Sequence, residues 1–175
     1  MQQLAARTGL IIGSLNRRTK LPLKVIVSSL LVVAGLMTAP LAVGAADRST
    51  PEQAKALAEK AATYLKDKGP DAALPAFNDR NGSFVHGDLY VFVFDMNGKY
   101  LASGANPTLT GTNAKDLKDA EGKPVVQDMI AKANENGSGQ VDYLWLNRSN
   151  NKVEHKSSYV VRTGDYIVGA GAYTP

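Results

Sequence analysis

Residues 89–105, "LYVFVFDMNGKYLASGA", decide the fold. Two runs of β-branched and aromatic residues flank Asn97-Gly98, and such a pair between two apolar runs is typical of a β-hairpin. The pair favours a type I′ turn, in which both central residues have positive φ. We therefore expect two antiparallel strands that join at Asn97-Gly98.

The segment before this hairpin has a helical pattern. Residues 50–53, "TPEQ", have the form of a capping box with proline in the first turn. Alanines and leucines follow at helical spacing as far as Leu65. Gly69-Pro70 should end this helix, and we expect a shorter helical piece over 71–79 to be interrupted at Pro75.

The segment after the hairpin predicts a crossover and three more strands. A polar connector over 106–123 leads into a helical pattern over 124–137, which has proline near its start and glycine at its end. Three strand-like runs follow over 139–147, 152–161 and 165–173, separated by short turns.

This order of elements predicts an α+β fold. We expect a PAS-like, five-stranded antiparallel sheet with a long N-terminal helix on one face and the helical crossover between strands two and three on the other. A pocket between the sheet and the crossover would be a usual place for a small ligand.

The first 46 residues differ from the remainder in charge. They hold five of the 20 Lys and Arg residues and none of the 16 Asp and Glu, so residues 47–175 carry 15 − 16 = −1. We interpret 1–46 as an export signal, because a basic start, an apolar run and the small residues around Ala45 and Ala46 are typical of one. A retained membrane anchor is the alternative, since the apolar run nearly reaches the length of a membrane span. The body, 47–175, is of one-domain size and has no net-positive field for nucleic acid.

Several short motifs occur in a particular order along the body. They are Asp95-x-x-Gly98, Asn106-Pro107 followed by Gly111, Asp119-x-x-Gly122-Lys123, Tyr143-x-Trp145, Lys156-x-x-Tyr159 and Gly169-x-Gly171-x-Tyr173. Together they make residues 88–175 resemble a single Cache domain, in particular the subtype found outside the membrane in bacterial chemoreceptors and histidine kinases. The resemblance implies a periplasmic sensor fold that recognises small organic anions and related metabolites.

Candidate ligand-binding residues lie on the third and fourth predicted strands. Tyr143 and Trp145 share one strand face and form a candidate aromatic wall, although ordinary core aromatics are the alternative. Leu144 and Leu146, on the other face, are expected to meet the N-terminal helix.

Lys156 is the residue that we single out, because a lysine within a sheet needs a partner and its ammonium suits a carboxylate. The alternative is a solvated lysine on an exposed strand face.

The neighbours of Lys156 alternate in direction, and a slip of one residue in strand register reverses both faces. Ser158 shares the Lys156 face, and the opposite face carries His155 and Tyr159. We therefore keep all of these as candidates. His155 could make binding depend on pH, and Tyr159 is either a phenol donor or a core tyrosine. Tyr90 is the remaining candidate, although its place beside Phe92 also suits the core.

Catalytic and metal-binding patterns are weak in this sequence. It holds no nucleophile elbow, no zinc-protease helix and no cysteine. His86 and His155 have too few neighbouring ligands for a metal site. We expect no enzyme activity, no metal and no cofactor.

The sequence leaves two functions open. The first is a sensor domain that binds a small organic anion, a carboxylate, and passes its occupancy to a membrane sensor. The second is an accessory protein of a membrane sensor or transporter that binds no ligand and forms a homodimer through the helix over 51–67.

Overall fold

The computed structural model describes residues 48–174 of the chain. The predicted export signal over 1–46 therefore lies outside the described residues and stays a prediction. None of the helices within the described part is long and apolar enough to cross a membrane. The described elements are α1 (Pro51–Lys68), α2 (Pro70–Asn78), β1 (Val85–His86), β2 (Leu89–Asp95), β3 (Tyr100–Ser103), a 3₁₀ turn η1 (Pro107–Leu109), α3 (Val125–Asn136), β4 (Ser138–Asn147), β5 (Lys152–Thr163) and β6 (Tyr166–Thr174).

The two helices before the sheet begin and end where the sequence places signals. Thr50 and Gln53 form the predicted capping box of α1, and Gly69 ends that helix with a positive φ. The expected interruption at Pro75 is wrong, because α2 runs continuously through it. Pro75 is exposed on this short helix, so the carbonyl that loses its donor can face water.

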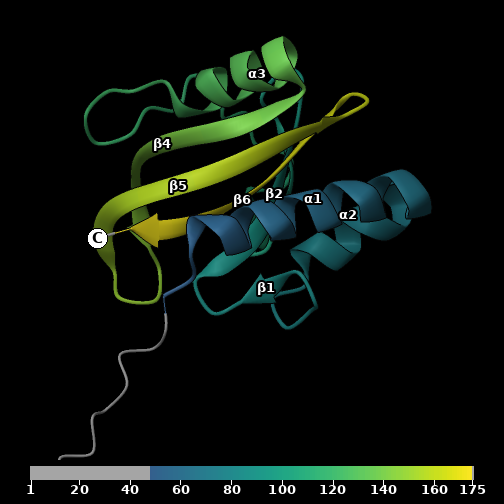
Figure 1. Cartoon of the computed structure of the whole chain (residues 1–175), viewed down its shortest axis with the longest axis horizontal. Helices are drawn as coiled ribbons and strands as arrows, with labels where there is room; N and C mark the ends of the chain where they lie inside the picture. The colour runs from purple at the N-terminus through teal and green to yellow at the C-terminus, as the bar shows by residue number, and fades with distance from the viewer. Residues whose placement is uncertain (1–47, 175) are drawn as a thin grey trace, which may run out of the picture. The chain divides into compact units, whose positions relative to one another are not determined.

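The sheet is antiparallel with the order β1-β2-β6-β5-β4, and β3 also pairs with β2 (Figure 1). The α+β, PAS-like architecture is confirmed. The sheet has a sixth strand beyond the five expected: β1, a two-residue pairing of Val85 and His86 with β2. So short a strand has no alternating pattern of its own, because its contact with β2 defines it.

The β2–β3 turn differs from the predicted type I′ turn. Gly98 has a φ of 81°, but Asn97 is not among the described residues with positive φ. The backbone N–H of Asp95 donates to the carbonyl of Lys99 at 3.0 Å, and the Asp95 carboxylate accepts from the N–H groups of Asn97 and Lys99. This carboxylate stabilises a longer loop in which only the glycine needs the left-handed conformation.

Two apolar layers cover the two faces of the sheet. On β2, Val91 and Val93 pack with α1 and α2, whereas Phe92 and Phe94 pack with α3. Figure 1 shows α1 and α2 together near β6 and β2, with α3 beyond β4. The candidate site lies in the second layer, between the sheet and α3.

The expected contact of Leu144 and Leu146 with the N-terminal helix is wrong. Neither residue belongs to the α1 layer, and Leu146 is 40% exposed. The reason is that α1 packs across β5 and β6, while β4 forms the far edge of the sheet.

Candidate functional site

Lys156 is buried at the centre of the sheet, on the α3 side. It lies opposite Tyr143 on β4 and opposite Tyr173 on β6, and its residue is only 1% exposed. Its Nζ atom lies 3.8 Å from the centre of the Tyr90 ring and 4.5 Å from that of Tyr173. Both rings can hold the ammonium through cation–π contacts.

The Lys156 ammonium forms no ion pair within the described residues. Its Nζ is a buried polar atom without a hydrogen-bond partner, and no carboxylate lies within ion-pair distance. Burial lowers the pKa of Lys156 below its ordinary value, and the nearby Tyr90 and Asp88 offset part of this effect. A buried amine in this state would gain from an anion that reached it.

Gly171 on β6 makes room for this lysine. A Cβ atom at Gly171 would lie 2.7 Å from Cε of Lys156 and 2.0 Å from Oγ of Ser158. The lysine chain therefore crosses β6 where β6 carries no side chain, and it reaches the Tyr90 ring. The side chains of Lys156 and Ser158 fill the space that a side chain at position 171 would occupy.

Ser158 and Tyr143 form a buried polar pair beside the lysine. The Tyr143 hydroxyl and the Ser158 hydroxyl lie 2.8 Å apart. Burial raises the pKa of Tyr143 well above its ordinary value, so this phenol stays neutral and can donate a hydrogen bond. Trp145 packs edge-on against the Tyr143 ring, with 5.7 Å between ring centres.

An inner cavity of about 50 Å³ lies between the sheet and α3. This volume exceeds the ~10–15 Å³ that one water needs by the same kind of measure. Its lining is largely aromatic and aliphatic, with a few polar groups. Among its lining residues are Tyr90, Phe92, Asn106, Val126, Met129, Tyr143, Trp145 and Arg148.

A wider outer cleft of about 560 Å³ adjoins the inner cavity. Tyr90, Ala105 and Arg148 line both hollows. Lys156 lines neither one, because the Tyr90 and Tyr173 rings cover its ammonium. A ligand that contacts Lys156 directly therefore requires the Tyr90 ring to turn aside.

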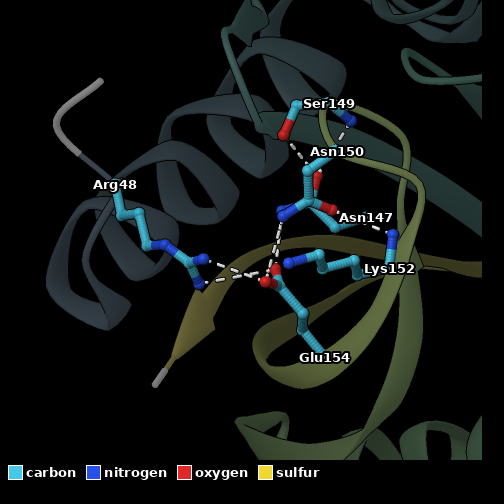
Figure 2. A network of polar contacts seen from close by, with 6 residues as sticks. All are labelled: Arg48, Asn147, Ser149, Asn150, Lys152 and Glu154. Carbon is cyan, nitrogen blue, oxygen red and sulfur yellow. Dashed lines mark hydrogen bonds and ion pairs between the residues drawn. The ribbon is translucent and has the colours of Figure 1, made fainter. Parts of the chain in front are cut away.

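The β4–β5 turn carries Arg148 to the rim of both hollows, and Glu154 holds this turn in place (Figure 2). The Glu154 carboxylate accepts hydrogen bonds from Asn147 at 2.8 Å and Asn150 at 3.0 Å. It also pairs with Arg48 at 2.9 Å, just before α1. These hydrogen bonds, from Asn147 first and then Arg48, lower the pKa of Glu154.

The candidate residues named from the sequence divide between the two faces of the sheet. Tyr90, Tyr143 and Trp145 line the inner cavity, and Lys156 and Ser158 lie directly beside them. The structure does not bring Tyr159 and His155 to this place.

Tyr159 lies on the other face, where its ring packs against the α1 layer and its hydroxyl lies 3.0 Å from that of Ser138. His155 shares that face of β5 and is exposed.

Other residues at the site are not among the candidates predicted from the sequence, although Asn106 belongs to one of the ordered motifs. Arg148 lies in a turn, and Asn106 and Met129 come from the crossover. Tyr173 has a sequence signal only as part of the last motif. No group of three or more His, Asp or Glu side chains suited to a metal ion occurs within residues 48–174.

The fold and this pocket together define the chain as a sensor domain of the PAS-like and Cache type. The family model of Single Cache domain 2 matches residues 45–175. The chain therefore belongs to the single Cache domain 2 family, as the ordered motifs indicate.

Similar proteins include receptors and their isolated sensor domains. The methyl-accepting chemotaxis protein McpP of Pseudomonas putida is 27% identical over 117 residues, which are 66% of this chain and 21% of that protein. The chain spans about a fifth of the length of the curated relatives it matches.

Two solved structures share the fold. A structure named "Periplasmic sensor domain of chemotaxis protein" is 28% identical with a TM-score of 0.57, covering 71% of this chain and 90% of that one. Another, named "Structural basis for carboxylic acid recognition by a Cache chemosensory domain", is 23% identical with a TM-score of 0.60, covering 71% and 92%.

Proposed function

We propose that this chain is a periplasmic sensor domain that binds a small organic anion, a carboxylate, and passes its occupancy to a membrane sensor. The observation that carries the proposal is the buried Lys156 ammonium, which has no anionic partner among the described residues. A carboxylate supplies the missing charge and accepts the hydrogen bonds that the ammonium offers.

The groups around Lys156 suit the remainder of such a ligand. When the Tyr90 ring turns away from the ammonium, it opens a path from the inner cavity to Lys156. The Tyr143 and Ser158 hydroxyls offer a donor for the second carboxylate oxygen, and Trp145 with Met129 surrounds the apolar part. Arg148 stands at the rim and attracts anions to the opening.

Two relatives support the direction of the proposal. McpP is a chemotaxis protein by name, and one structure of the same fold is named for carboxylic acid recognition. The export pattern at 1–46 fits a periplasmic location. The proposed partner is a membrane sensor of the kind in which such domains occur.

The test is a thermal-shift screen of the protein against carboxylates of two to six carbons. A ligand at 100 times its Kd should stabilise the folded state by about 2.7 kcal/mol. Lys156→Met should abolish the shift, and Lys152→Met, an exposed lysine of the same strand, should keep it. A shift that persists in Lys156→Met would remove this lysine from the site.

The competing function is a ligand-free accessory protein. No acid would then change the unfolding midpoint, and native mass spectrometry would show no bound small molecule while a pulldown yields a stable partner. Homodimerisation through α1 belongs to this alternative. The exposed positions of α1, such as Glu52, Lys55, Glu59 and Lys66, are mostly charged, which gives such an interface little apolar surface.

A further inference from the structure

The outer cleft carries two arginines without a partner. Arg80 follows α2, and Arg148 lies in the β4–β5 turn; both line this cleft. Within residues 48–174 no hydrogen bond or ion pair engages either guanidinium group. The other described arginines, Arg48 and Arg162, are engaged by side-chain or backbone oxygens.

One acid also lines the cleft. Asp88 immediately precedes β2, and its carboxylate accepts a hydrogen bond from Ser49 at 2.7 Å. The lining of the cleft therefore carries two positive charges against one negative charge. This balance favours an anionic group in the cleft over a cationic one.

The cleft also lies directly over the buried ammonium. Tyr90 and Tyr173 line the cleft, and the same two rings cover Nζ of Lys156 at 3.8 Å and 4.5 Å. The two unpartnered arginines thus border the cleft, and the buried Lys156 lies behind the Tyr90 and Tyr173 rings that line it. A ligand that displaces Tyr90 contacts Lys156 at one end while its other end remains in the cleft.

We propose that the ligand carries a second anionic group, and that Arg80 and Arg148 hold it in the outer cleft. The ligand class is thereby a dicarboxylate. This inference rests on the proposed function, because it takes the first carboxylate to bind at Lys156. Guanidinium groups suit the second carboxylate, since their planar donors bind both of its oxygens at once. A cleft of about 560 Å³ leaves room for that group.

Calorimetric titration of matched ligands tests the inference. The ligands are dicarboxylates of three to five carbons, the monocarboxylates of equal length, and 4-aminobutyrate, whose second end is cationic. We expect the best dicarboxylate to bind at least tenfold more tightly than its matched monocarboxylate. 4-Aminobutyrate should bind more weakly than either.

The Arg80→Gln variant separates the cleft from the inner site, because Arg80 lines only the cleft. It should reduce the preference for the dicarboxylate at least fivefold and leave monocarboxylate affinity unchanged. The control is Lys66→Gln, which removes one exposed positive charge on α1 and should leave the preference unchanged.

Three results would overturn the inference. If a monocarboxylate bound as tightly as its matched dicarboxylate, the arginines would not bind a second carboxylate. The proposed function would still stand. If 4-aminobutyrate bound more tightly than the dicarboxylates, Asp88 and not the arginines would bind the second end of the ligand. If none of the ligands bound, the inference and the proposed function would both fall.

Discussion

The ammonium of Lys156 lies 3.8 Å from the centre of the Tyr90 ring, buried within the sheet. An aromatic face stabilises a cation, but it does not neutralise its charge. Tyr90 also lines both the inner cavity and the outer cleft. Its ring therefore lies between the buried ammonium and the space where a ligand would bind.

Lys156→Met should stabilise the protein when no ligand is present. The variant puts an apolar side chain of similar length in place of a buried cation that forms no ion pair within the described residues. Replacement of a buried ion pair by apolar residues is often neutral or stabilising by about 1–4 kcal/mol, and at Lys156 the loss of two cation–π contacts reduces the gain. We expect a net gain of about 1 kcal/mol in urea unfolding at pH 7. A loss of more than that amount would mean that the lysine is already satisfied in the ligand-free state.

The same lysine should make stability depend on pH. Burial lowers the folded-state pKa of Lys156 below its ordinary value of 10.5, so between these two values the unfolded chain binds the additional proton. Stability rises with pH wherever the unfolded state binds more protons. The unfolding free energy of the wild type should therefore rise toward pH 10 relative to that of Lys156→Met. A difference between the two proteins that stays constant with pH would contradict this assignment.

Gly171→Ala should damage the site. Its Cβ would meet Ser158 and Lys156 at distances that no packed structure allows. We expect a loss of about 1–3 kcal/mol in stability, together with weaker carboxylate binding. The matched control is Gly139→Ala, where the new Cβ meets only the flexible chain of Lys132 and neither glycine has a positive φ. Equal losses of stability in the two variants would show that the packing around Lys156 is no tighter than that around Gly139.

Tyr143→Phe should leave the Ser158 hydroxyl buried without its partner. An unsatisfied buried group costs about 1–3 kcal/mol, so the variant should be less stable by that amount. Ser158→Ala in the same background should recover part of the loss, because both polar groups are then absent. A double-mutant cycle by chemical denaturation measures the coupling, and a coupling energy near zero would argue against the hydrogen bond.

Glu154→Gln should loosen the β4–β5 turn. The carboxylate holds Asn147, Asn150 and Arg48, and its lowered pKa means that its contribution is present above pH 4.5 and lost as the pH falls through the lower, folded-state value (Figure 2). We expect faster amide hydrogen exchange in residues 148–151 and weaker anion binding, since Arg148 depends on this turn. Glu59→Gln, which breaks an exposed pair on α1, is the control. Unchanged exchange in the turn would show that Glu154 does not order it.

The sequence predicts the helices and long strands well, because each has a local signal. The capping box at Thr50, the run of β-branched and aromatic residues over 89–95 and the glycine after α3 each act within a few residues. The β2–β3 turn was predicted in place but not in type, because the Asp95 carboxylate stabilises a longer loop than Asn97-Gly98 alone suggests.

The site is less predictable, because register and loops decide it. Which face of β5 points toward α3 depends on the pairing of Tyr143 with Lys156, and a shift of one residue would have selected His155 and Tyr159 instead. Arg80 and Arg148 lie in loops, where only the tertiary structure places them beside Tyr90. Sequence periodicity does not show which face of β5 points toward α3 or which loop residues meet at the cleft.

The pKa of Lys156, measured by NMR of its labelled side chain with and without a bound carboxylate, tests whether this lysine awaits an anion. We expect a pKa below the ordinary lysine range in the ligand-free protein, and a clear rise when the carboxylate supplies the missing charge. An ordinary pKa without ligand, or one that does not move when a carboxylate saturates the protein, would contradict this expectation.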